Sequence, residues 1–318
     1  MGIRELDFIF IVDQIISNNL NKGKILILGY QDVYFGKDYV KKIFKKYENF
    51  DHEKIKDTKN KNFYKHGFCD SRSLFESLGF SKVDILDASD YEGAEIIFDM
   101  NEELIKEHFN QYDFIFDWGT IEHVYDTKQY LTNIFSLLKS NGHYLCLAPA
   151  SGLIEHGYYQ YSPIFFKDYF RQNNWKVVNN FIINIKNIFA DETWYIYEYI
   201  DNSMDMYAMG GIDDSIYFSY NLVKKDLNTT FDKIINQTQF VDRWNKKNDD
   251  YYQSFFDLFG INFFKTNQLT YNKSKWEIFK ITNLFKIDED YNYQFPTLNI
   301  NKCLYILYDE KLIKNVLD

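Results

Sequence analysis

The stretch at residues 111–150, "QYDFIFDWGTIEHVYDTKQYLTNIFSLLKSNGHYLCLAPA", contains two short apolar runs separated by an amphipathic segment. The first run, 111–119, resembles a short strand with an acid, Asp117, near its end, and we expect it to be a buried strand of a mainly parallel sheet. Residues 127–139 repeat apolar side chains at helical spacing. An Asn-Gly turn then leads into the second run, 143–150. The order strand, helix, strand predicts a crossover unit of an α/β fold.

The same alternation continues on both sides of this unit. It predicts further strands at residues 23–30, 82–90, 94–101, 175–185 and 215–226, and helices at 5–19, 38–47, 70–80 and 162–173. We therefore expect a Rossmann-like sandwich, with a mainly parallel seven-stranded sheet and helices on both faces. The first helix should cover a sheet edge, and the last strands should be antiparallel at an edge.

The composition changes after residue 226, which predicts a domain at 1–226 and an extension at 227–318. One clear late strand, 303–309, lies in this extension. We interpret the extension as a lid or as an oligomerisation element, so a homo-oligomer is expected as one form of the protein.

Charge and cysteine usage exclude several classes of protein. The net charge of −10 argues against a nucleic-acid partner, which needs clustered Lys and Arg. Because no run approaches the roughly 20 apolar residues of a membrane helix, we expect no membrane insertion. The three cysteines are far apart and lack metal-ligand spacing. These features predict a cytoplasmic protein with reduced thiols and without a metal site, with a divalent ion that assists an acceptor diol as the open alternative.

Suggestive residues follow four predicted strands, and ligands of open α/β sheets bind at the carboxyl ends of strands. Gly29 would let a ligand approach the backbone closely. Asp87 is placed to accept hydrogen bonds from ribose hydroxyls, with Asp90 as a competitor for that role. Asp99 would bond an exocyclic adenine amine, or else would serve as a turn residue. Asp117 would contact the amino group of a cofactor or position the turn.

The first loop helps to choose the cofactor. The segment "GYQDVYFG" lacks the glycine pattern of a dinucleotide fold, and Asp32 would repel a pyrophosphate. A cationic cofactor without phosphate fits better, and S-adenosylmethionine is such a molecule. Met100 or Ile97 would then lie against the adenine face.

Several of these segments together resemble a known family. The order "KILILG", "VDILDASDYEGAEIIFDMN" and residues 112–150 is similar to class I S-adenosylmethionine-dependent methyltransferases, although the first loop departs from their G-x-G pattern. The segment "EHGYYQYSPIFFKDYF" at 155–170 resembles a bacterial group encoded among genes for surface-sugar and capsule biosynthesis. The resemblance implies methyl transfer from S-adenosylmethionine, which leaves S-adenosylhomocysteine, to a sugar hydroxyl.

A hydroxyl acceptor would be helped by a general base, and histidine is the natural one near neutral pH. Of the six histidines, only His123 and His156 lie in loops after predicted carboxyl strand ends. Each is a candidate base; otherwise His123 would fix the turn and His156 would contact the substrate. Tyr158, Tyr159 and Gln160 would line the acceptor site or merely pack.

Two other functions remain open from the residues. The same fold would also serve a small phosphorylated or amine acceptor. The irregular first loop is also compatible with a non-catalytic relative whose extension mediates assembly with biosynthetic partners.

Overall fold

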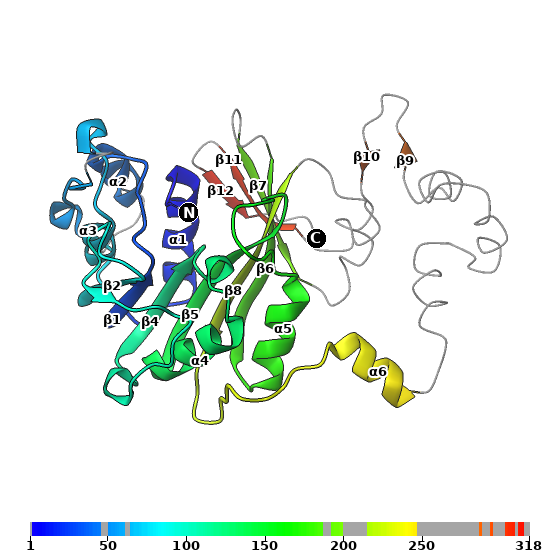
Figure 1. Ribbon diagram of the computed structural model, residues 1–318. Helices are drawn as coiled ribbons and strands as arrows, with labels where there is room; N and C mark the ends of the chain where they lie inside the picture. The colour runs from blue at the N-terminus through cyan, green and yellow to red at the C-terminus, as the bar shows by residue number, and fades with distance from the viewer. Residues whose placement is uncertain are drawn as a thin grey trace. The chain divides into compact units, whose positions relative to one another are not determined.

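One large mixed sheet organises the chain in the computed structural model, in the order β12-β11-β7-β6-β8-β5-β4-β1-β2-β3 (Figure 1). Neighbouring strands from β3 to β5 run parallel, and those from β5 to β12 run antiparallel. The strands are β1 Lys24–Leu28, β2 Lys82–Asp87, β3 Ile96–Ile97, β4 Tyr112–Trp118, β5 Leu138–Ser151, β6 Lys176–Lys186, β7 Thr193–Glu198, β8 Ile216–Lys224, β11 Cys303–Tyr308 and β12 Lys311–Lys314. The predicted Rossmann-like α/β fold is confirmed.

The sheet is larger than the seven strands expected. All seven strands predicted for it are present, and β7, β11 and β12 on its antiparallel side bring the described sheet to ten strands. The strand β8 lies between β5 and β6, so the prediction of an edge position for it is wrong. Its burial explains this, because seven of its nine residues are buried.

The structure describes residues 2–45, 50–60, 64–186, 192–199, 215–246, 286–287, 293–294, 303–308 and 311–314. The chain forms two units, of which the first contains Met1–Glu198, Asp214–Ile234 and Cys303–Asp318. Tyr199–Asp213 and Ile235–Lys302 form the second. In it the structure describes the helix α6, Thr238–Lys246, and an antiparallel pair of β9, Lys286–Ile287, with β10, Tyr293–Gln294. The boundary at 226/227 stays a prediction, and β11 of the predicted extension pairs with β7 of the first unit.

Helices cover both faces of the sheet. They are α1 Glu5–Ser17, α2 Lys37–Phe44, α3 Ser71–Ser77, α4 Thr127–Leu137 and α5 Pro163–Gln172. On α1, Gln14 accepts hydrogen bonds from Tyr220 of β8 and Asn179 of β6. Since β6 and β8 are inner strands, α1 covers a face, and the prediction that it covers an edge is wrong. Among the helices in the described ranges, none is both long and apolar enough to cross a bilayer.

The alternation of side chains along β4 divides the core into two layers. Phe116 and Trp118 stack on the same side of the strand with ring centroids 5.4 Å apart, and Phe75 of α3 packs 4.8 Å from Phe116. Asp117 points to the opposite layer, where α4 and α5 lie. A fully buried Phe stabilises a fold by about 1.5–3 kcal/mol, so this aromatic layer stabilises the packing of the central strands against α3.

Candidate active site

The ends of β1, β2 and β4 converge at Gly29. Its φ of +68° lies in the left-handed region that favours glycine, and its amide donates to the Leu86 carbonyl at 2.8 Å. Thr120 donates its hydroxyl to the Leu28 carbonyl at 2.8 Å. A Cβ on Gly29 would lie only 3.1 Å from that hydroxyl oxygen. The three strand ends therefore form one tightly packed corner, next to the place where the strand order reverses.

Asp87 lies at this corner, at the last position of β2. Its half-buried carboxylate accepts a hydrogen bond from the Tyr30 amide at 3.1 Å and a long one, 3.4 Å, from the Ser89 amide. A carboxylate offers about four acceptor positions, so Asp87 retains capacity for ligand hydroxyls. Its predicted competitor Asp90 is exposed and lies in a turn closed by the Gly93 amide.

The predicted adenine-binding residues differ in their exposure. The exposed Asp99 accepts hydrogen bonds from the amide and the side chain of Asn101, at 2.9 and 2.8 Å, as a turn residue does. Met100 is buried, and Asn133 of α4 donates to its carbonyl at 3.1 Å. Ile97 is 50% exposed. The sequence reasoning missed Asn133, although a polar residue on the apolar side of a predicted helix was a usable signal.

Asp117 is fully buried and accepts three hydrogen bonds. The hydroxyls of Tyr130 and Tyr144 each donate to it at 2.7 Å, and the Thr120 amide donates at 2.9 Å. Burial raises the pKa of this carboxyl, while the bonds from Tyr130 and Tyr144 oppose the rise. Asp117 was predicted either to contact a cofactor or to position the turn after β4. Its bond from the Thr120 amide fits the second role.

That turn is a short 3-10 helix, Ile121–His123. It carries Glu122 and His123, and His156 from the loop after β5 lies beside them. Glu122 is fully buried, and neither carboxylate oxygen has a hydrogen-bond partner among the described residues. Nε2 of His123 lies 3.8 Å from Glu122 Oε1, and Nε2 of His156 lies 3.7 Å from the same oxygen. The histidine rings are 5.1 Å apart at 66°. The predicted meeting of these two loops is present.

Burial controls the charges of this Glu122–His123–His156 cluster. It raises the pKa of Glu122 to about 8, with a further contribution from Asp117. Burial also lowers the pKa of both His123 and His156, and for His123 the neighbouring His156 adds to the effect. With no ligand bound, both imidazoles are therefore neutral near pH 7 and able to accept a proton.

The loop after β5 is fastened to this turn through the backbone of Glu122. Its carbonyl accepts hydrogen bonds from the amides of Tyr158, at 2.8 Å, and Tyr159, at 3.3 Å. A Cβ on Gly157 would lie 2.8 Å from the same oxygen, so the close approach requires glycine. Gln160 is exposed, and its side-chain oxygen accepts a hydrogen bond from the Leu153 amide at 3.4 Å.

Two exposed tyrosines border the cluster. Tyr125 is 73% and Tyr158 71% exposed, and their rings meet edge to face at 6.3 Å. Tyr159 donates its hydroxyl to the Tyr125 carbonyl at 2.9 Å, which holds the two loops together beneath the rings. Of the residues predicted to line an acceptor site, Tyr158 thus presents an open aromatic surface, while Tyr159 is partly engaged in packing.

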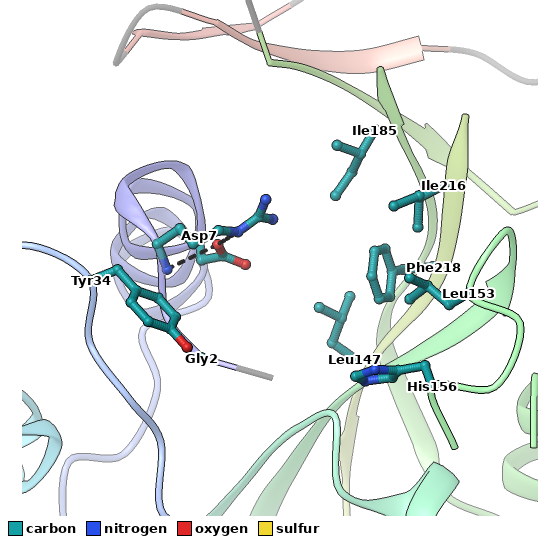
Figure 2. Close-up of a pocket in the computed structure, with 10 residues that line it drawn as sticks. Gly2, Asp7, Tyr34, Leu147, Leu153, His156, Ile185, Ile216 and Phe218 are labelled. Atoms are coloured by element: carbon teal, nitrogen blue, oxygen red, sulfur yellow. Dashed lines mark hydrogen bonds and ion pairs between the residues drawn. The ribbon is translucent and has the colours of Figure 1, made fainter. Parts of the chain in front are cut away.

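A pocket of about 220 Å³ adjoins His156 (Figure 2). One wall is apolar and carries Leu147, Leu153, Ile185, Ile216 and Phe218; the other contains Gly2, Arg4, Asp7 and Tyr34. Figure 2 shows Asp7 and Tyr34 across the opening from Phe218, with His156 at one end. The pocket therefore has one apolar wall, a polar wall that includes α1, and the His156 imidazole at one end.

The polar wall is a network that the sequence reasoning missed. Asp7 is buried and accepts hydrogen bonds from Arg4 at 2.9 Å and from the Trp118 indole at 3.0 Å. Arg4 also pairs with Glu192 at 2.9 Å. Burial raises the pKa of Asp7, and Arg4 opposes that rise. The available signal was an acid within the otherwise apolar segment "LDFIFIV".

Comparisons with known proteins find no matching family model and no matching curated protein. Solved structures with a similar chain path include a SAM-dependent methyltransferase from Archaeoglobus fulgidus (10% identity, 68% of this chain and 93% of that one, TM-score 0.37). The O-MT segment of StiE is 10% identical over 75% of this chain and 78% of its own, with a TM-score of 0.37.

A third similar structure is 1,6-didemethyltoxoflavin-N1-methyltransferase from Burkholderia thailandensis, with 1,6-didemethyltoxoflavin and S-adenosylhomocysteine bound. It is 10% identical over 70% of this chain and 78% of its own, with a TM-score of 0.30.

Proposed function

We propose that this chain is an S-adenosylmethionine-dependent methyltransferase that methylates a hydroxyl group. One observation carries the proposal: His156 lines the pocket, and its Nε2 lies 3.7 Å from Oε1 of Glu122. Both residues lie in loops at the strand ends next to the switch in strand order. An acceptor in the pocket would thus lie beside a group able to take its proton. A cofactor at the corner of Gly29 would lie along the same edge of the sheet.

The cofactor assignment rests on the chemistry of the corner. Gly29 has no side chain and adopts a left-handed conformation at the strand end, so a ligand could approach the backbone closely, and Asp87 has acceptor capacity for ribose hydroxyls. Asp32 in the first loop adds negative charge, which suits the sulfonium and ammonium groups of S-adenosylmethionine. Met100, Ile97 and Asp99 follow along the chain as the proposed adenine-binding segment.

Each part of the cluster has a task in methyl transfer to oxygen. When bound, S-adenosylmethionine supplies a methyl group that is activated by its sulfonium. Neutral His156 or His123 accepts the proton of the acceptor hydroxyl, since the pKa of each imidazole is lowered and its Nε2 is close to Glu122. Glu122 lies 3.7–3.8 Å from both Nε2 atoms; burial raises its pKa to about 8, and its ionised form would stabilise the resulting imidazolium. The apolar wall of the pocket excludes water from the reacting atoms.

A sugar is the acceptor that we propose. The exposed rings of Tyr125 and Tyr158 offer aromatic faces at the edge of the cluster, and the C–H faces of a sugar ring pack well on such surfaces. The resemblance of residues 155–170 to proteins of surface-sugar biosynthesis points to an acceptor in capsule or surface-polysaccharide synthesis. The cytoplasm, where activated sugars are assembled, is the compartment that fits this role.

An acceptor screen tests the reaction. The full chain is incubated with S-adenosylmethionine and panels of nucleotide sugars, free sugars, phosphorylated metabolites and amines, and products are read by mass. We expect a gain of one methyl group on a sugar oxygen. Methylation confined to amines or to non-sugar phosphates would overturn the sugar assignment while leaving methyl transfer in place.

A further inference from the structure

We propose that Glu122, His123 and His156 form a binding site for a divalent transition-metal ion. Each side chain offers one ligand atom, and these three atoms lie within 4.8 Å of one another. Ligand atoms of a single ion are roughly 3 to 4 Å apart when each bond is about 2.1 Å long. Small side-chain rotations would therefore bring all three onto one ion.

The unpartnered atoms are the independent sign that a ligand belongs here. Glu122 is fully buried, yet neither of its carboxylate oxygens has a hydrogen-bond partner in the described part of the chain. Nε2 of His156 is likewise buried and unpaired among those residues. A buried polar group without a partner costs free energy, and a bound cation would satisfy the carboxylate and the imidazole together.

The donor set selects the class of ion. Mg²⁺ and Ca²⁺ prefer all-oxygen sites, whereas two imidazoles with one carboxylate suit Mn²⁺, Fe²⁺, Co²⁺ or Zn²⁺. The side chains of His123 and His156 are 45% and 31% exposed, while that of Glu122 is not exposed at all. An ion would therefore be anchored from the buried side and would keep open positions toward solvent for water or an acceptor oxygen.

The backbone supports the site from both loops. The bond from the Tyr158 amide to the Glu122 carbonyl fixes the loop of His156 against the turn that carries the other two ligands. The sequence shows no cluster of metal ligands, because these three residues are not grouped along the chain. Glu122 and His123 are adjacent, but His156 comes from the next strand end and joins them only in space.

Metal uptake is measured directly with the tag-free full chain. After treatment with a chelator, the protein is titrated with Mn²⁺ by electron paramagnetic resonance and with Zn²⁺ by metal analysis after dialysis. We expect one ion per chain, and at least tenfold weaker binding in Glu122→Gln and His156→Gln. His108→Gln, which changes an exposed histidine away from the cluster, should bind as the unaltered chain does.

Circular dichroism shows whether each variant is folded, and His156→Gln, in a partly exposed loop, tests the site if Glu122→Gln does not fold. Absence of binding at 1 mM of both ions would overturn the proposal. Equal binding by the unaltered chain and both cluster variants would also do so.

A role of this ion in methyl transfer rests on the proposed function. With the ion bound, His123 and His156 would each use a ring nitrogen to hold the ion, so neither would be free to act as a base. The ion would instead bind the acceptor oxygen and lower the pKa of its hydroxyl. Methyl transfer that a chelator abolishes and Mn²⁺ restores would support this role. Full activity in a chelator would overturn it, whereas metal binding without methyl transfer would count against the proposed function alone.

Discussion

The amide of Tyr158 donates a 2.8 Å hydrogen bond to the carbonyl of Glu122 and so ties the loop after β5 to the turn after β4. The bond works together with Gly157, whose missing side chain lets the two backbones approach. His156 is held near the Glu122 carboxylate by the same contact. The arrangement of the candidate site thus depends on backbone geometry as much as on its polar side chains.

Gly157→Ala should separate the two loops. The new methyl group would lie 2.8 Å from the Glu122 carbonyl oxygen and 2.9 Å from its Cγ, so the loop must move away. We expect ion affinity at the cluster to fall at least tenfold, measured by Mn²⁺ titration. Ile154→Ala is the control, because that side chain lies in the same loop and is 85% exposed. An unchanged affinity in Gly157→Ala would show that the close approach is not required.

Asp87→Asn should weaken the binding of the cofactor. Loss of the carboxylate charge weakens its hydrogen bonds to ribose hydroxyls, and we expect affinity for S-adenosylhomocysteine to drop about tenfold, or about 1.4 kcal/mol, by calorimetry. Asp90→Asn serves as the matched change three residues further along the chain and should leave the affinity unaltered. The reverse result would assign the ribose to Asp90.

Asp117→Asn should lower stability more than cofactor affinity. An amide cannot accept all the bonds that the carboxylate receives from Tyr130, Tyr144 and Thr120, so one buried donor loses its partner. We expect the free energy of unfolding, measured in urea, to fall by about 1–3 kcal/mol. Undiminished stability with lost affinity for S-adenosylhomocysteine would instead place Asp117 in contact with the cofactor.

His143 should make the stability depend on pH between about 6.5 and 4. Burial, assisted by Lys224 and Lys176, lowers the pKa of His143 to about 4. Between these values the unfolded chain binds more protons than the folded chain, so the free energy of unfolding falls as the pH falls. In His143→Gln this contribution is absent, and the decline in stability should be shallower.

Urea unfolding at pH 7, 5.5 and 4.5 measures both slopes. His108→Gln, at an exposed position, should retain the slope of the unaltered chain. Parallel declines in the unaltered chain and His143→Gln would contradict the assignment of this pH dependence to His143.

Much of the fold could be predicted because it depends on local pattern. The run at 111–119 alternates between an aromatic side, which carries Phe114, Phe116 and Trp118, and a side that carries Asp113 and Asp117, and it forms β4 inside the sheet. This alternation places Asp117 opposite the aromatic side. Its burial had no signal in the sequence, because the polar side of a strand usually faces solvent and the tyrosines that contact Asp117 come from other elements.

The candidate site was predictable as far as topology determines it. Parallel neighbouring strands end at the same edge of a sheet, so the meeting of His123 and His156 followed from their positions after β4 and β5. The buried carboxylate of Glu122, which has no hydrogen-bond partner among the described residues, did not follow, because its position depends on the 3-10 turn that directs this side chain inward. The role of Arg4 and Asp7 could not be predicted, because their partners Trp118 and Glu192 are distant in the sequence and meet them only when α1 packs on the sheet.

Calorimetric titration of the full chain with S-adenosylhomocysteine tests the central claim most directly. The proposed cofactor site predicts one molecule bound per chain, with an affinity that Asp87→Asn reduces about tenfold and Asp90→Asn leaves intact. Absence of any binding of S-adenosylhomocysteine or S-adenosylmethionine at millimolar concentration would contradict the claim.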